Sequence, residues 1–115
     1  DNIAIMLNEE FVVPASAPFA EDGTTLVPLS FLTEALDASL KWKNGLITIK
    51  KDDTVIKLQT YSDTAFVNGS MMMLSHVPVV ENDTAYVPIR FISEVFGLNV
   101  AWDENNQLIT LTDKK

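Results

Sequence analysis

Two glutamates stand at matching places in two similar segments, Glu34 in the first and Glu94, 60 residues later, in the second. Paired carboxylates are the groups that general acid–base catalysis and glycoside hydrolysis commonly use. Both glutamates fall on the polar side of a predicted amphipathic helix. Solvated or salt-bridged side chains are therefore the better interpretation.

His76 is the only histidine in the chain. A lone imidazole can serve as a base or a ligand, but no serine or cysteine partner for it can be argued from spacing. We expect a surface or hydrogen-bonded polar residue. Phosphate-binding loops, zinc-ligand spacings and nucleophile motifs are also absent from the sequence. We predict no catalytic residue and no cofactor.

The candidate binding residues are Trp42, Trp102, Arg90 and Met72. The two indoles could form a platform for sugar rings, yet they alternate in phase with Leu40 and Val100, which favours packing in the core. Met72 is the middle one of three methionines, 71–73, which put at least one on each face of a strand. One of them could contact a partner, although simple strand packing is favoured.

Two loops, 81–84 and 103–106, are rich in the oxygen ligands that calcium takes. Neither has the Asp-x-Asp-x-Asp-Gly spacing of an EF-hand, and Asn and Asp are ordinary turn formers. The absence of cysteine excludes disulfides and thiolate metal sites. We predict no metal site.

Composition restricts the partners. The 115 residues suffice for one ordinary domain, residues 1–115. The formal net charge of −8 repels nucleic acid and anionic membranes. No apolar run approaches the roughly 20 residues that a membrane helix needs. We expect no nucleic-acid partner and no membrane insertion.

The elements that must position these side chains come from an internal repeat. Residues 24–36, running on to Trp42, return as residues 84–96, running on to Trp102, and the repeats extend over approximately 3–51 and 63–112. Each Val-Pro pair is followed by a helical pattern, in which Pro28 is placed to fix the first turn. The predicted inward residues are Leu29, Phe31, Leu32, Ala35 and Leu36, then Ile89, Phe91, Ile92, Val95 and Phe96; the predicted outward ones are Ser30, Thr33, Glu34 and Asp37, then Arg90, Ser93 and Glu94.

The segments around the helices are β-prone. We predict hairpins over residues 3–13, ended by Pro14, over 40–49 through Asn44-Gly45, over 65–73 through Asn68-Gly69, and over 100–111. Residues 15–23 are expected to be a loop, and residues 54–58 a strand that joins the copies. The fold class is α+β: two quasi-repeated β-hairpin/helix/β-hairpin units, with two short helices packed on mostly antiparallel sheet.

The pattern Leu-Val-Pro-Leu-x-Phe-Leu-x-Glu-Ala-Leu, followed by a strand that ends in Trp and a turn before Ile-Thr-Ile, resembles the copper amine oxidase N-terminal-like, or stalk, domain family. Such domains occur in secreted and surface proteins of Gram-positive bacteria. The resemblance covers residues 3–112. Two positions depart from the family pattern: Ser30 replaces the Arg seen at Arg90, and Asp37 replaces the Gly seen at Gly97.

The resemblance implies an appended domain that lies apart from the copper and the quinone of the oxidases. The catalytic domain of that family binds copper through three histidines, whereas this chain has one. The Asn-Tyr-Asp/Glu segment that forms the quinone is also absent, because Tyr61 follows Thr60 and Tyr86 follows Ala85. Copper amine oxidation by this chain is chemically implausible.

The resemblance therefore implies a non-catalytic stalk, spacer or docking module of a bacterial secreted or cell-surface protein, extracellular or associated with the cell wall. The alternative is a carbohydrate- or peptidoglycan-binding module that uses an exposed aromatic. A protein or cell-wall partner is expected in either case. Self-association through an exposed edge strand is a further expectation.

Overall fold

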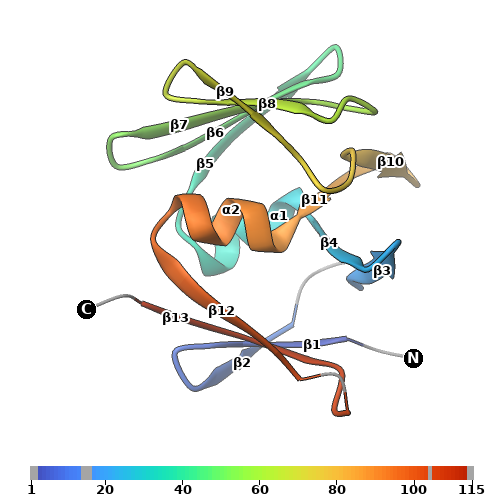
Figure 1. The fold of residues 1–115 in the computed structure, drawn as a ribbon, viewed down its shortest axis with the longest axis vertical. Coiled ribbons are helices and arrows are strands. Elements are labelled where there is room, and N and C mark those ends of the chain that lie inside the picture. Colours follow the sequence, from blue (N-terminus) through green and yellow to red (C-terminus); the bar gives the residue numbers. More distant parts are fainter. Residues whose placement is uncertain (1–2, 14–16, 104, 114–115) are drawn as a thin grey trace.

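The computed structural model describes residues 3–13, 17–103 and 105–113 (Figure 1). Two short helices occupy the middle of the molecule, with one sheet above them and one below in this view. In chain order the strands are β1 (Ala4–Leu7), β2 (Glu10–Val12), β3 (Phe19–Glu21), β4 (Thr24–Pro28), β5 (Ser39–Lys43), β6 (Leu46–Lys51), β7 (Thr54–Gln59), β8 (Thr64–Val67), β9 (Ser70–Met73), β10 (Val79–Glu81), β11 (Thr84–Pro88), β12 (Leu98–Asp103) and β13 (Leu108–Asp113), and the helices are α1 (Leu29–Ala35) and α2 (Ile89–Val95).

The strands form three sheets, which we name the five-stranded sheet (β5-β6-β7-β8-β9), the central sheet (β10-β11-β4-β3) and the terminal sheet (β12-β13-β1-β2). Strands β1 and β13 pair in parallel, and every other pairing among the described strands is antiparallel. The α+β class and the packing of two short helices on mostly antiparallel sheet are confirmed.

The centre of the fold has a twofold relation between the repeats. In the central sheet Val27 of β4 pairs directly with Val87 of β11, and these valines occupy the same place in the two copies. Helix α1 packs on β11 of the other copy and on β5, while α2 packs on β4 of the other copy and on β12. Each helix therefore covers strands from both copies, and neither copy could bury its helix alone.

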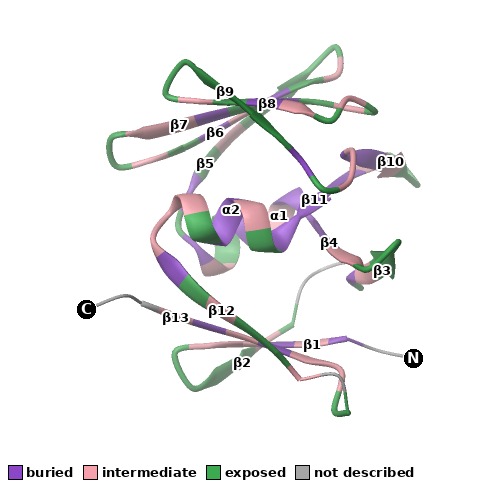
Figure 2. Cartoon of the chain, viewed as in Figure 1, coloured by how far each residue is buried: buried purple, intermediate pink, exposed green. Residues whose placement is uncertain are grey.

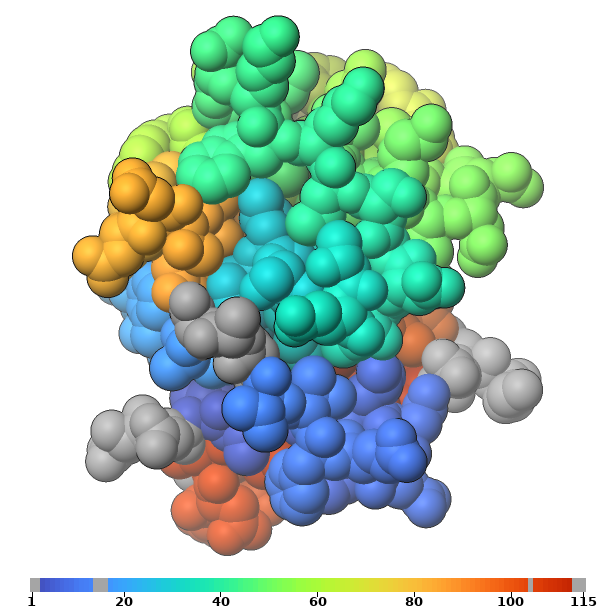
Figure 3. Space-filling model, turned by 180° about the vertical axis from the view of Figure 1, so that it is seen from behind, coloured from blue at the N-terminus to red at the C-terminus, as the bar shows by residue number. Residues whose placement is uncertain are grey.

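The two outer sheets are completed in different ways. Strand β7 continues the chain from β6 and pairs with it antiparallel. In the terminal sheet the place beside β13 is taken by β1 from the opposite end of the chain, with Ala4 opposite Leu108. Figure 3 shows the result from behind, where the blue N-terminal hairpin lies against the red C-terminal strands.

The helices bury the sides that the sequence predicts. Leu29, Phe31, Leu32 and Leu36 are buried in the first copy, and Ile89 and Ile92 in the second; Ala35, Phe91, Val95 and Phe96 are half-buried and pack on the same core. In Figure 2 both helices carry buried residues, drawn in purple, alternating with exposed ones, drawn in green. One hydrophobic cluster thus contains residues from both copies.

Three predictions about local structure need correction. Pro28 and Pro88 have extended ψ values of 154° and 118°, so they end β4 and β11 and precede the first helical turn instead of occupying it. Ser93 was predicted to face outward but is completely buried. The expected loop at 15–23 contains β3, and its counterpart β10 was likewise not foreseen; the predicted stop at Pro14 lies outside the described residues.

The predicted turns are confirmed. Asn44 and Gly45 have φ values of 53° and 82°, and Asn68 and Gly69 have 49° and 87°, as two-residue hairpin turns with two left-handed residues require. Both helices are followed by a left-handed residue, which is Asp37 at φ 58° in the first copy and Gly97 at φ 84° in the second.

Within the described ranges, no helix has the length and apolar character that crossing a membrane requires.

Candidate functional site

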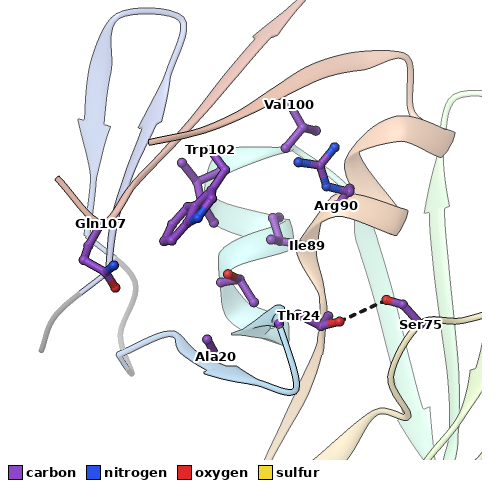
Figure 4. Close-up of a pocket in the computed structure, with 11 residues that line it drawn as sticks. Ala20, Thr24, Ser75, Ile89, Arg90, Val100, Trp102 and Gln107 are labelled. Carbon is purple, nitrogen blue, oxygen red and sulfur yellow. Dashed lines mark hydrogen bonds between the residues drawn. The ribbon is translucent and has the colours of Figure 1, made fainter. Parts of the chain in front are cut away.

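An open cavity of about 520 Å³ lies where the β3–β4 hairpin of the first copy meets α2, β12 and β13 of the second. Its floor is apolar and consists of Ile89, Val100 and Ile109. Figure 4 shows the indole of Trp102 and the guanidinium of Arg90 on either side of Ile89. The cavity is therefore a hydrophobic hollow with one aromatic wall and one cation.

The cavity brings together two of the residues that the sequence proposed for binding. Arg90 projects from the first turn of α2, and Trp102 lies near the end of β12, twelve residues along the chain. The Arg90 guanidinium makes an exposed ion pair with Glu94 one turn later, with 3.4 Å between Nη1 and Oε2. An exposed pair of this kind contributes little to stability, so the guanidinium can exchange Glu94 for a ligand.

Polar contacts join the connection between β9 and β10 to the β3–β4 hairpin at the edge of the cavity. Ser75, in the connection between β9 and β10, makes a hydroxyl–hydroxyl hydrogen bond of 3.1 Å with Thr24 at the start of β4. The next residue, His76, places its Nε2 3.1 Å from Oε1 of Glu21, and its Nδ1 lies 2.8 Å from the carbonyl oxygen of Val77. His76 is thus a hydrogen-bonded polar residue, as predicted, and ties this connection to the end of β3.

The prediction that both indoles are buried in the core is wrong. Trp42 pairs with the buried Ile47 and Trp102 with the buried Ile109, so both indoles do stand on the inner faces of their sheets. However, β5 and β12 are edge strands, and the indoles are 40% and 39% exposed. Part of each indole is therefore available for contact.

The other candidate residues lie away from the cavity. Trp42 occupies the equivalent position in the first copy. Met72 lies on β9, at the edge of the five-stranded sheet, where Met71, Met72 and Met73 are all exposed. The expectation that these methionines pack within the sheet is therefore wrong.

The glutamates and the oxygen-rich loops behave as the simpler interpretation predicted. Glu34 and Glu94 are exposed on different helices, and Glu94 is salt-bridged to Arg90. Asn82 and Asp83 form the turn between β10 and β11. Within the described ranges, no group of three or more His, Cys, Asp or Glu side chains is placed to hold a metal ion.

The carboxylate of Asp103 is already engaged by its own turn. The side-chain amide of Asn106 donates to Oδ2 at 2.8 Å, and the main-chain N–H groups of Asn106 and Asn105 donate to Oδ1 at 3.3 and 3.1 Å. These hydrogen bonds, that of the Asn106 side chain first, lower the pKa of Asp103. The group therefore acts as a turn brace; Glu104, the neighbour in this loop, lies outside the described residues.

Sequence reasoning missed the part of the site contributed by the first copy, namely Ala20, Thr24 and Thr25 of the β3–β4 hairpin, and also Ser75. Strand β3 lies within residues 15–23, which were expected to be a loop, because its three residues are too few for a periodic pattern. The one available signal was Asp22-Gly23, a dipeptide typical of two-residue hairpin turns.

Comparison with known protein families shows to which family the chain belongs. A family profile for the copper amine oxidase N-terminal domain matches residues 6–111, which is nearly the whole sequence. The chain belongs to the copper amine oxidase N-terminal domain family. In copper amine oxidases this domain is a non-catalytic accessory domain. The predicted resemblance is thereby confirmed.

Proposed function

We propose that this copper amine oxidase N-terminal-like domain is a non-catalytic stalk or docking module of a bacterial secreted or cell-surface protein. The observation that carries the proposal is the chemistry of the cavity. Among its described lining residues there is no Asp, Glu, His, Lys or Cys, so it lacks an acid or a base that could activate the hydroxyls of Thr24, Thr25 and Ser75. An aromatic wall, an apolar floor and one guanidinium suit recognition of a partner.

The test compares the full-length gene product with a version that lacks residues 3–113, each fused to a fluorescent protein. We expect surface labelling of intact cells, and retention in the wall fraction, to fall when the domain is removed, while any catalytic rate of the remaining protein stays unchanged. Turnover by the isolated domain that Glu94→Gln abolishes without loss of stability would contradict the proposal.

A second candidate function, binding of wall carbohydrate, is favoured by the exposure of Trp42 and Trp102. Sugar rings stack on half-exposed indoles of this kind. Sedimentation with insoluble peptidoglycan would measure it. Binding that is lost in Trp102→Ala or Trp42→Ala supports the wall-binding function, and equal recovery of all three proteins in the supernatant excludes it.

The proposed module also has a surface for self-association. Strand β9 is an edge of the five-stranded sheet, and all four of its residues are exposed, without a charge among them. Phe66 on the neighbouring β8 is exposed opposite Met71. Edge strands without charges or prolines add to one another readily. A dimer seen by analytical ultracentrifugation should dissociate in Met72→Lys, and a monomer at all concentrations would exclude the interface.

A further inference from the structure

The two edges of the central sheet carry the same main-chain groups. Strands β3 and β4 are joined by a two-residue turn, so the flanking pair Glu21 and Thr24 is the hydrogen-bonded one. In the next pair, Ala20 and Thr25, the N–H and C=O of Ala20 must then point away from β4. The same register places Val80 opposite Ala85 at the other edge, with its N–H and C=O also directed outward.

At the edge formed by β10 these outward groups are occupied. The hydroxyl of Tyr61 accepts a hydrogen bond from the Val80 N–H at 3.0 Å and donates one to the Val80 carbonyl at 3.2 Å. The N–H of Tyr61 also donates to the Pro78 carbonyl at 2.7 Å. A single tyrosine thus makes hydrogen bonds to both polar main-chain groups of Val80. Its own backbone has a left-handed φ of 62°, which is unfavourable for a residue with a large side chain.

The position of Tyr61 follows from how the five-stranded sheet is built. The chain leaves β7 with the Thr60 N–H donating to the Gly45 carbonyl at 2.9 Å, and Tyr61 is the next residue. In the terminal sheet the equivalent bond runs from the Ala4 N–H to the Gln107 carbonyl at 2.8 Å, but β1 is parallel to β13. The chain beyond Ala4 therefore runs backward to Ile3, which is buried in the core.

Consequently the edge at β3 has no counterpart of Tyr61 among the described residues. Ala20, whose N–H and C=O point away from β4, is one of the residues that line the cavity of about 520 Å³, together with Trp102 and Arg90. Figure 4 shows Ala20 across the cavity from Val100. Among the described residues, a tyrosine thus occupies one edge of the central sheet, and no side chain takes the same position at the other edge, beside the cavity.

We propose that this cavity binds a tyrosine side chain presented by a loop of a protein partner. The phenol hydroxyl accepts from the Ala20 N–H and donates to the Ala20 carbonyl, as Tyr61 does at Val80. The ring lies on the apolar floor against Trp102, and the Arg90 guanidinium adds a cation–π contact. The inference rests on the proposed docking function and names the chemistry that the partner offers.

A tyrosine side chain differs from the alternative ligands, phenylalanine and a sugar, because it combines a hydroxyl group with an aromatic ring. A phenylalanine would keep the aromatic contact but leave both groups of Ala20 without a partner. A sugar could supply hydroxyls and stack on Trp102, but its binding would not depend on hydrogen bonds to the main chain of Ala20. Selectivity for tyrosine over phenylalanine, tied to Ala20, is therefore the signature of the proposed site.

The experiment titrates the ¹⁵N-labelled 115-residue chain with the peptide acetyl-Thr-Tyr-Ser-amide, which copies residues 60–62, and with its Phe analogue. We expect the largest amide shift at Ala20 and a shift of the Trp102 indole, with about fivefold weaker binding of the Phe peptide, because the hydroxyl contributes about 1 kcal/mol. Trp102→Ala should abolish binding, while the matched variant Trp42→Ala leaves it unchanged.

A second variant isolates the edge itself. Ala20→Pro removes the outward N–H at a position where proline is tolerated, because the donor faces away from the sheet. We expect the preference for tyrosine over phenylalanine to disappear, with the amide spectrum otherwise retained. Equal binding of both peptides by the unmodified chain, or an Ala20 amide that does not move, would overturn the tyrosine site.

A third arm separates this failure from failure of the proposed function. An oligomer of N-acetylglucosamine that shifts the Trp102 indole and leaves Ala20 unmoved, while the tyrosine peptide does not bind, overturns the tyrosine site and leaves a non-catalytic module in place. Catalytic turnover by the isolated domain, in contrast, contradicts the proposed function whatever the peptides do.

Discussion

At the scale of single residues, Ser93 departs most from what its surroundings require. Its side chain is completely buried on α2, and its hydroxyl has no hydrogen-bond partner among the described residues. The equivalent Thr33 of the first copy is exposed and donates to the carbonyl of Ser30 at 2.9 Å. A buried hydroxyl without a partner loses its hydration and gains nothing in return.

Replacing Ser93 by alanine should therefore stabilise the domain. We expect the free energy of unfolding to rise by about 1 kcal/mol, because the desolvated hydroxyl is removed and alanine also favours the helix. Urea denaturation followed by tryptophan fluorescence measures the change. The matched variant Thr33→Ala should lower stability slightly, since it removes a hydrogen bond; a destabilised Ser93→Ala would reveal a role for the hydroxyl.

Asp103 gives a prediction about pH. Its folded-state pKa lies below the ordinary value of 3.8, chiefly because of the Asn106 side chain. A lowered pKa means that the carboxylate stabilises the fold above pH 3.8 and that this contribution is lost as pH falls through the lower folded pKa. The side-chain carbon shift of Asp103 should titrate below pH 3.8, and Asn106→Ala should raise the midpoint toward that value. An identical midpoint in both proteins would show that the turn does not act on this group.

The sequence predicted which residues belong to the site more accurately than how far these residues are exposed to solvent. Alternation correctly put Trp42 and Trp102 on the inner faces of their sheets, because period-two spacing determines which side a residue faces. It says nothing about what covers that side. Since β5 and β12 are edge strands, the indoles extend past their cover. Strand order comes from pairing between distant segments, which no local pattern contains.

At the scale of elements, the repeat allows each helix to serve as a control for the other. Both helices are followed by a left-handed residue, Asp37 at φ 58° and Gly97 at φ 84°. A left-handed conformation is unfavourable for a residue with a Cβ atom, and glycine avoids this strain.

Asp37→Gly should therefore stabilise the domain by roughly 0.5 kcal/mol, because the strain removed exceeds the extra chain entropy of glycine in the unfolded state. The reverse exchange, Gly97→Asp, should destabilise it by a similar amount; a Cβ at Gly97 meets no atom within 4 Å, so strain alone acts. Thermal unfolding of the two variants provides the measurement. Shifts of the same sign would contradict the interpretation.

Helices and the longer hairpins were predictable because their signals are local: a 3.6-residue period after each Val-Pro pair, and Asn-Gly between alternating segments. The short strands β3 and β10 were not. Each has three residues, too few for a period to show, and each is held by pairing with β4 or β11. As a result the sequence located the half of the cavity made by α2 and β12 and missed the half made by β3.

At the scale of the whole molecule, the repeats share one core. The main cluster contains Val27 and Phe31 of the first copy together with Val87 and Ile92 of the second. The first and last strands are also neighbours, since β1 pairs with β13 and completes the sheet of β12 and β13. A domain of about 60 residues is marginal by itself, so the two copies stabilise each other.

This arrangement predicts that the two copies unfold together. Trp42 and Trp102 occupy equivalent places in different copies, so Trp102→Phe leaves a fluorescence reporter in the first copy and Trp42→Phe leaves one in the second. For each of these two variants, we expect the urea transition followed by the remaining tryptophan to coincide with the transition of the same variant followed by far-ultraviolet circular dichroism. Val27→Ala, at the twofold pair, should move both reporters equally, by about 2 kcal/mol. If the Trp42 reporter unfolded at a different urea concentration from the backbone signal of the same variant, the copies would be separate folding units. In that case one copy would unfold first, and the cavity between the β3–β4 hairpin and α2, which needs both copies, would be lost at that stage.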